Sequence, residues 1–510
     1  MADSRVRNTI ISTFTNILEQ IITIVFGFVV PRLVIKTFGS EINGLTAFIT
    51  QFLNLFQLLQ CGTVGASIYA LYKPIATNDY EKINEIVDAS KKFFYKVGFV
   101  FSFLCLLLIP IICFLQKDSF FKIWELIVVT LIMGINAALS FFFDARYDIV
   151  ISSYQKRYVL SLARITNKFS YYILVFLVIF LKSHFVFLYA SSLIGKCVSI
   201  IFLHHYYKLY SKEWMKPLSH NNYKIKNRGY LLSIQISFQV VAALPFIIVS
   251  MFYDLTQTSV YSINYMIMNI MYLLVSAFCM SITEPLANYK NTHDEETFFS
   301  FFYMIFYSII FIISIFSACF ICLDTPFIKL YMNGVNAELY ARPYFAYTLS
   351  ISYIFMAIYL LLNLCIDMYG LFREIHLFTI LSLIISFLVF IFIGKFFSIE
   401  FIPFGLTCYY FLIDVSYFFV IQRKTKMISR SKFLFSLISI FGTSILLLLL
   451  NKCFGFECNT FIKWLVYALI LVCIAFVIET LFLILIDRKT IVRLSKYACK
   501  LINNKILRKN

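Results

Sequence analysis

The sequence predicts an all-α integral membrane protein with about fourteen transmembrane helices. Hydrophobic residues make up 61% of the 510 positions and charged residues only 14%, whereas charged residues make up about a quarter of an ordinary soluble domain. Long apolar runs recur along the whole chain, and roughly 20 mostly apolar residues suffice for a helix to cross a bilayer. The spaces between these runs are too short for a large soluble domain.

The apolar runs place the expected helices in order along the chain. The second and eighth runs are the most polar, and the last two follow a long basic segment. The runs lie near residues 10–32, 45–72, 97–115, 123–145, 159–181, 184–203, 231–252, 259–283, 299–323, 345–369, 376–396, 401–421, 433–451 and 461–486.

The uneven distribution of Lys and Arg predicts the orientation. If the N-terminus is cytoplasmic, most basic residues fall in cytoplasmic segments, above all 73–96, 146–168, 208–228 and the tail after the last helix. This is the bias expected of a multi-pass membrane protein. We therefore expect both termini in the cytoplasm. The formal net charge of +18 then reflects topology and contact with the lipid bilayer, and it does not indicate a nucleic-acid partner.

A charged phrase occurs twice, which predicts two related lobes. "ALYKPIATNDYEKI" (70–83) has a weaker copy in "ANYKNTHDEETF" (287–298). Taken alone, each copy could be ordinary interfacial chemistry. However, both follow an even-numbered helix and six helices separate them, as in a parallel repeat of two six-helix lobes. The predicted parts are an N-terminal lobe over 1–207, a cytoplasmic loop over 208–230, a C-terminal lobe over 231–422, and two extra helices with a basic tail over 423–510.

Polar side chains at helical spacing mark the first two helices of each predicted lobe. Such stripes are costly against lipid and should face protein or water. They could simply join helices to one another. Because they recur on repeat-equivalent helices, we favour a hydrated substrate cavity between the lobes. The candidate cavity residues are Asn16, Gln20, Gln51, Asn54, Gln57, Gln235, Gln239 and Asn269.

Charged residues inside the spans each call for a partner or a function. Glu19 and Lys196 are identified as the deepest, and Glu284 lies near the cytoplasmic end of the eighth helix. Arg146 and Arg164 belong to a mixed-charge cluster where the fourth and fifth helices approach the cytoplasm. That cluster could be a set of neutralising ion pairs, or a cationic mouth that attracts an anionic substrate.

Two stretches resemble a known family. "FGSEINGL" (38–45) and "CGTVGASIYALYKPIATNDYEKI" (61–83) are similar to the N-terminal lobe of bacterial polysaccharide flippases. These belong to the multidrug, oligosaccharidyl-lipid and polysaccharide exporter superfamily. The resemblance covers the whole chain in helix count and repeat plan, but the letters that carry it lie mostly in the first hundred residues.

The resemblance implies a V-shaped pair of lobes in the bacterial cytoplasmic membrane. It also implies alternating access, and outward movement of undecaprenyl diphosphate-linked repeat units for O-antigen, capsule or a related surface glycan. Other surface-polysaccharide assembly proteins are then possible partners. Lipid II flippases carry cavity arginines on helices 1, 2 and 8, where this chain has Asn, Gln and Glu, so a lipid II role is disfavoured. The candidate diphosphate contacts are Lys73, Arg146, Arg164 and Lys196.

The sequence leaves open what drives transport and allows alternative functions. The membrane potential could drive export of a diphosphate, or protons could exchange at Glu19 or Glu284. A drug or organic-cation antiporter of the same fold is the main alternative, and a purely structural membrane protein is a weaker one. No catalytic constellation, nucleotide motif or cofactor site is visible, so we expect neither an enzyme nor a cofactor. A disulfide between Cys453 and Cys458 is a further hypothesis.

Overall fold

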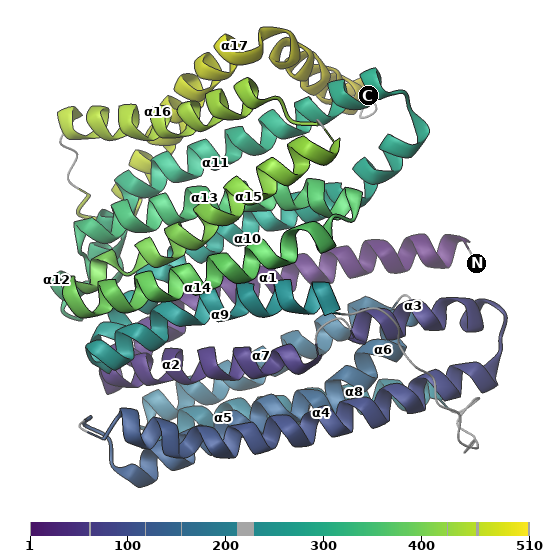
Figure 1. Cartoon of the computed structure of the whole chain (residues 1–510). Coiled ribbons are helices and arrows are strands. Elements are labelled where there is room, and N and C mark those ends of the chain that lie inside the picture. Colours follow the sequence, from purple (N-terminus) through teal and green to yellow (C-terminus); the bar gives the residue numbers. More distant parts are fainter. Residues whose placement is uncertain are drawn as a thin grey trace. The chain divides into compact units, whose positions relative to one another are not determined.

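The computed structural model describes residues 2–60, 63–117, 119–154, 156–211, 229–425, 427–454 and 458–507. Within these residues the regular elements are helices, and fourteen segments are long and apolar enough to cross a membrane (Figure 1). The side chains of some helical residues, including the predicted site residues Lys73 and Glu284, lie outside the described part. Most of the predicted loop over 208–230 lies outside it as well.

The chain divides into two compact units, Met1–Ser259 and Val260–Asn510. The first unit therefore includes α9, which packs against α2. The lobe boundaries expected from the sequence stay predictions.

Within its described residues, the first unit is built from α-helices and two short helical turns, η1 and η2. Its most extensive contacts are those of α7 with α8 and with α1. The elements are α1 (Ala2–Phe38), α2 (Ser40–Phe56), η1 (Gln57–Gln60), α3 (Thr63–Ala76), α4 (Tyr80–Leu115), α5 (Ile123–Leu139), η2 (Ser140–Asp144), α6 (Ala145–Ser153), α7 (Arg157–Phe180), α8 (Val186–Ser211) and α9 (Gly229–Phe252).

The second unit places α11 against α13, α16 and α17, and α15 against α13 and α14 (Figure 1). The boundary between the units falls within α10. The elements are α10 (Leu255–Thr292), α11 (Glu295–Tyr331), α12 (Ala337–Tyr340), α13 (Pro343–Tyr369), α14 (Phe372–Phe396), η3 (Ile399–Phe401), α15 (Pro403–Thr425), α16 (Arg430–Phe454) and α17 (Phe461–Leu507).

Two local features depart from the uninterrupted helices that hydropathy suggests. The helix expected over 45–72 consists of α2, the 3-10 turn η1 and α3, so it is not continuous. In the fourth span, α5 passes into α6 through the π-helical turn η2. A π-turn adds one residue per turn and reorients the side chains around it, and such turns are frequent at functional sites.

The repeated charged phrase marks equivalent helix starts in the two units. Asp79 is the N-cap of α4 and accepts a hydrogen bond from the backbone N–H of Lys82 at 3.2 Å. Asp294 is the N-cap of α11 and accepts from the backbone N–H of Thr297 at 3.0 Å. An aspartate N-cap satisfies one of the backbone donors left free at a helix start. Helix capping thus gives the aspartate that the two copies share a structural role.

Candidate functional site

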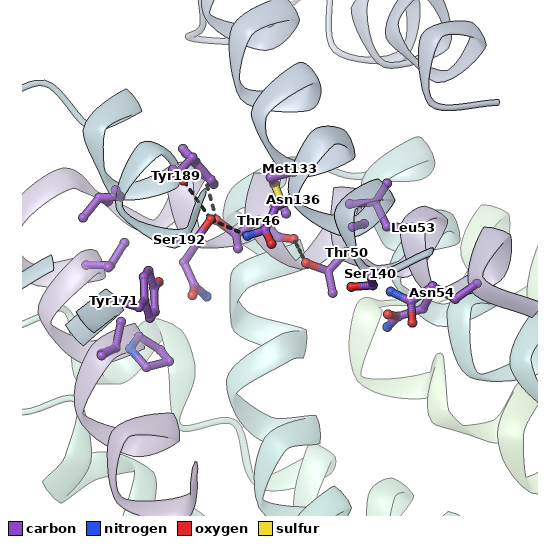
Figure 2. Close-up of a pocket in the computed structure, with 17 residues that line it drawn as sticks. Thr46, Thr50, Leu53, Asn54, Met133, Asn136, Ser140, Tyr171, Tyr189 and Ser192 are labelled. Atoms are coloured by element: carbon purple, nitrogen blue, oxygen red, sulfur yellow. Dashed lines mark hydrogen bonds between the residues drawn. The ribbon is translucent and has the colours of Figure 1, made fainter. Parts of the chain in front are cut away.

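A pocket of about 440 Å³ lies within the first unit (Figure 2). Seventeen residues from α1, α2, η1, α5, η2, α7 and α8 line it, and all of them are uncharged. Ten of the lining residues carry an amide or a hydroxyl group: Asn43, Thr46, Thr50, Asn54, Gln57, Asn136, Ser140, Tyr171, Tyr189 and Ser192. The remaining wall is apolar, so the pocket combines hydrogen-bonding groups with apolar surface.

One face of α2 and η1 supplies half of these polar groups. Five lining residues follow one another in steps of three or four, which aligns them along a single helical face: Asn43, Thr46, Thr50, Asn54 and Gln57. The hydroxyls of Thr46 and Tyr189 hydrogen-bond at 2.8 Å, which ties α2 to α8. The Asn43 amide donates to the hydroxyl of Ser259 at 2.8 Å, which ties α2 to the start of α10.

A second wall of the pocket is formed by α5, η2 and α8. The Asn136 amide donates to the Ser192 hydroxyl at 2.8 Å, and Ser192 in turn donates to the carbonyl of Tyr189 at 2.7 Å (Figure 2). Asn136 lies in a very apolar helix, where an amide without a hydrogen bond would be unfavourable. The bond to Ser192 satisfies this amide. The result is an ordered, uncharged polar wall.

Lys196 lies next to this wall, at the π-turn. Its ammonium group donates to the hydroxyl of the pocket residue Ser140 at 2.9 Å and forms an ion pair with Asp144. Ser140 and Asp144 are the first and last residues of η2, so the turn directs both toward α8. Lys196 is buried, and one carboxylate oxygen of Asp144 has no hydrogen-bond partner among the described residues.

Arg146 is engaged elsewhere. Its guanidinium donates to the hydroxyl of Tyr207 at 2.8 Å and stacks 4.6 Å from the centre of that ring. The nearby hydroxyl of Tyr147 hydrogen-bonds to His204 at 3.0 Å. These contacts fix Arg146 between α6 and α8, and it does not line the pocket.

A second charged cluster joins α1 to α7. The buried carboxylate of Glu19 accepts from Arg164 at 2.8 Å and from Lys168 at 3.5 Å, both at the same oxygen. Lys168 also donates to Thr23, one turn further along α1. Half of the Arg164 side chain is exposed. Two basic side chains therefore share one carboxylate, which leaves the cluster with an excess of positive charge.

The predicted cavity residues have different surroundings. Asn54 and Gln57 line the pocket, whereas Gln51 on the same helix is partly buried outside it. Asn16 accepts a hydrogen bond from Ser161 on α7, and Gln20 is exposed. On α9 and α10, three further candidates are exposed or half-buried: Gln235, Gln239 and Asn269. One cavity shared by all four predicted stripes stays a prediction.

Sequence reasoning overlooked several buried groups. It placed Lys168 at the cytoplasmic surface, although α7 continues through this residue and brings it to Glu19. It identified Glu19 and Lys196 as the deepest charges, but Asp414 and Glu479 are also buried within spans. A position-by-position search for Asn and carboxylates in the apolar runs would have found them. The structure has Cys453 and Cys458 as free thiols.

The fold matches known transporter structures. No protein-family model matches the chain, and no curated protein sequence matches it. The lipid II flippase MurJ in an inward closed conformation aligns with a TM-score of 0.63 at 16% identity, covering 94% of this chain and all of that one. An inward-facing multidrug resistance MATE family transporter of the MOP superfamily aligns with a TM-score of 0.62 at 12% identity, covering 78% of this chain and 94% of that one.

The same fold is known in a second conformation. An outward-facing multidrug resistance MATE family transporter aligns with a TM-score of 0.51 at 13% identity, covering 82% of this chain and 96% of that one. The predicted fold class is thus confirmed: the chain is a multi-pass helical membrane protein with the fold of MATE transporters and MurJ. At these identities the likeness establishes the fold alone, and the substrate must be argued from the residues.

Proposed function

We propose that this protein is a flippase. It moves undecaprenyl diphosphate-linked oligosaccharide repeat units from the cytoplasmic to the outer leaflet of the bacterial inner membrane, for surface polysaccharide synthesis. The fold supports the proposal, because MurJ is a lipid II flippase and MATE proteins with this fold occur in inward-facing and outward-facing conformations. Transport then follows an alternating-access cycle.

The uncharged polar pocket of the first unit is the observation that carries this proposal. A sugar presents many hydroxyl groups and no charge, so its binding site needs closely spaced hydrogen-bonding groups together with some apolar surface. The pocket offers both, with ten amide- or hydroxyl-bearing residues among seventeen. Its volume of about 440 Å³ falls in the usual range for small-molecule sites, about 300–1,000 Å³. We therefore propose that this pocket binds part of the glycan.

Two basic clusters of the first unit suit the diphosphate of such a substrate. Arg164 and Lys168 share the Glu19 carboxylate, and an excess basic group in a span is stabilised by an anionic partner. The half-exposed guanidinium of Arg164 is suited to bidentate contact with phosphate oxygens. Lys196 is the second candidate, because it already contacts a pocket residue. Arg146 becomes a weaker candidate since Tyr207 engages it.

A drug or organic-cation antiporter is the second candidate function. MATE transporters with this fold are multidrug resistance proteins, and Glu19 is a buried acid. A site for organic cations should present an accessible carboxylate. Here two basic side chains occupy the Glu19 carboxylate, and the pocket is lined by uncharged residues. These observations favour the flippase.

Deletion of the gene in its own host tests the proposal. The measurements are undecaprenyl diphosphate-linked oligosaccharide in membranes, surface polysaccharide, and growth with cationic dyes. The flippase predicts that lipid-linked oligosaccharide accumulates while surface glycan falls. Normal glycan together with increased dye toxicity would instead support the antiporter.

Complementation with pocket variants links the phenotype to the site. Asn136→Asp places a negative charge in the pocket, where it repels a diphosphate-linked substrate and attracts a cation. We expect this variant to fail in glycan export at normal protein abundance. Restored dye resistance by Asn136→Asp, without a glycan defect, would contradict the assignment.

A further inference from the structure

We propose that Asp414 is a proton-binding site, protonated in the described conformation and able to exchange its proton with water during the transport cycle. The proton binding stands on the second unit alone, and the coupling to transport rests on the proposed function. The sequence offers proton exchange at Glu19 or Glu284 as one of two alternatives for coupling, whereas the geometry points to a different helix.

Asp414 lies in the middle of α15, far from either helix end. The residue is only 4% exposed. Both of its carboxyl oxygens are buried without a hydrogen-bond partner among the described residues. An ionised carboxylate in such a place lacks both water and donors, a situation that proteins avoid by neutralising the group. A protonated carboxyl group is therefore the form that fits this site.

Glu479, in the same unit, is a buried carboxylate whose oxygens accept hydrogen bonds from protein hydroxyl groups. It is fully buried between α11, α16 and α17. One oxygen accepts from Ser314 at 2.6 Å and Thr443 at 2.7 Å, and the other accepts from Ser439 at 3.1 Å. Three hydroxyl donors thus replace water around Glu479, whereas the described surroundings of Asp414 provide none.

Several tyrosines lie near Asp414 in the sequence of α15 and on the helices packed against it. Tyr410 and Tyr417 lie on its own helix, four residues before it and three residues after it. From α13, the Tyr359 ring lies 5.7 Å from that of Tyr410 and 5.9 Å from that of Tyr417. Asp367 of α13 acts electrostatically on Tyr417. Phenol groups can accept and donate hydrogen bonds, so they offer a route for a proton once water enters.

The charged groups on the neighbouring helices lie toward helix ends. On α14 these are Arg373, Glu374, His376 and Lys395. Glu374 pairs with Lys424 at 3.4 Å, near the C-terminal end of α15. From α10, the titratable groups in this region are Tyr265 and Tyr272, which interact with Tyr410. Within the described residues, Asp414 therefore has no ion-pair partner from the elements packed against it.

Glu19 is poorly suited to the same task. Its carboxylate accepts from both Arg164 and Lys168, so neutralising it would leave two basic groups without an anion. Glu284 lies outside the described side chains. Asp324 on α11 resembles Asp414 in burial and in having no hydrogen-bond partner for either oxygen among the described residues. It differs in position, because Cys319, Cys322 and Leu323, which precede it on α11, belong to a buried apolar cluster.

Infrared spectroscopy of the purified protein in lipid nanodiscs tests proton binding directly. The measured quantity is the carbonyl-stretching band of protonated carboxyl groups at neutral pH. We expect Asp414→Asn to remove part of this band without changing the melting temperature, because an amide closely matches the neutral acid. Asp324→Asn is the matched control and should remove a separate part. An unchanged band in Asp414→Asn would overturn the proposal, whatever the protein transports.

Reconstituted vesicles then test coupling, with lipid-linked oligosaccharide from the deletion strain as the probe. For one proton per cycle, a pH gradient of one unit shifts the final distribution of substrate about tenfold. We expect Asp414→Asn to abolish this shift, and Asp414→Glu and Asp324→Asn to keep it. A shift that persists in Asp414→Asn would refute coupling at this site. Failure of the wild-type protein to move the oligosaccharide would refute the proposed function and leave the infrared result standing.

Discussion

In the first unit, Glu19 and Lys196 are buried in ion pairs, whereas the buried carboxyl groups of the second unit have no basic partner among the described residues. Glu19 pairs with Arg164 and Lys168. By contrast, Glu479 is bound by hydroxyls and Asp414 has no hydrogen-bond partner among the described residues. The buried ionisable side chains of the two units therefore differ in their partners: basic side chains in the first unit, and hydroxyl groups or none among the described residues in the second.

Burial differs between individual helices of the two units. In their most apolar windows, 72% and 83% of the residues are buried in the spans of α11 and α13, against 17% in those of α1 and α7, although α10 of the second unit also has only 17%. Enclosed helices can hold neutral acids and hydroxyl networks, whereas less enclosed helices can present ionic groups and a pocket to a substrate. We propose that the first unit recognises the substrate and that the second unit carries the proton.

The largest expected effect concerns the packing that holds the pocket face of α2. A Cβ atom on Gly44 would lie 1.8 Å from the carbonyl oxygen of Leu255, whereas a Cβ on Gly27 would meet no atom within 4 Å. We expect Gly44→Ala to lower the free energy of unfolding by about 3 kcal/mol, because the backbone must move. Gly27→Ala, the control, should be neutral or slightly stabilising. Equal thermal melting of the two variants would contradict this close approach.

The ion-pair cluster should give the next largest effect. Glu19→Gln leaves Arg164 and Lys168 without a carboxylate. Removing one partner of a buried pair is strongly destabilising, but Arg164 is half-exposed, so we expect a loss of about 2 kcal/mol in denaturation of the detergent-solubilised protein. Adding Lys168→Met to Glu19→Gln should recover part of the loss. A double variant less stable than the single one would show that charge balance is not the cause.

A matched pair of threonines tests the assignment of the pocket. Thr46 and Thr166 both donate to the carbonyl four residues earlier, but only Thr46 lines the pocket. We expect Thr46→Val to reduce glycan export about tenfold, equivalent to about 1.4 kcal/mol, and Thr166→Val to leave it unchanged. The readout is surface polysaccharide at equal protein abundance. Equal export by the two variants would exclude the pocket from substrate recognition.

Glu479→Gln should have a smaller effect than Glu19→Gln. The amide keeps an acceptor for some of the hydroxyl donors and leaves no basic group without a partner. We expect a loss of about 1 kcal/mol in the same denaturation experiment. A loss of unfolding free energy as large as that of Glu19→Gln would contradict the proposed difference between the two units.

The smallest effect concerns the repeated N-caps, where the units behave alike. Hydrogen bonds from Lys82 lower the pKa of Asp79 below its ordinary value of 3.8, and hydrogen bonds from Thr297 lower the pKa of Asp294. Because each pKa is depressed on folding, the capping stabilisation is present above about pH 3.8 and is lost as the pH falls through the lowered pKa.

Amide hydrogen exchange measures this effect locally. Asp79→Ala should speed exchange at the backbone N–H of Lys82 near neutral pH, and Asp294→Ala should do the same at Thr297. Both differences from wild type should shrink once acid protonates the caps. Differences that grow toward low pH would show that the caps act through some other contact.

The sequence predicted the membrane spans, but it did not predict the two places where a helix is interrupted within a span. Apolar runs define the membrane spans because burial in lipid demands them, and fourteen spans are present in the described residues. The breaks at η1 and η2 escaped prediction. Both lie inside apolar or mixed stretches, where hydropathy carries no information about local backbone geometry.

The site was predicted in part. Asn54 and Gln57 line the pocket, but the expected stripe continued through Gln51, while the actual face runs through Thr46 and Thr50. A threonine hydroxyl can bond to a carbonyl of its own helix, as those of Thr46 and Thr50 do. Whether it also faces a pocket depends on neighbouring helices that the sequence does not place. Asp414 was not predicted, because the polar stripes that indicate a site in the sequence lie on the first two helices of each predicted lobe, whereas Asp414 lies on α15.

Transport by the purified protein tests the central claim most directly. Vesicles containing the protein are loaded with lipid-linked oligosaccharide from the deletion strain, and its appearance on the trans leaflet is measured with a glycan-cleaving enzyme confined to that side. The account predicts transfer well above protein-free vesicles, reduced about tenfold by Thr46→Val and unaffected by Thr166→Val. Transfer no faster than in protein-free vesicles, together with protein-dependent movement of a cationic dye, would contradict it.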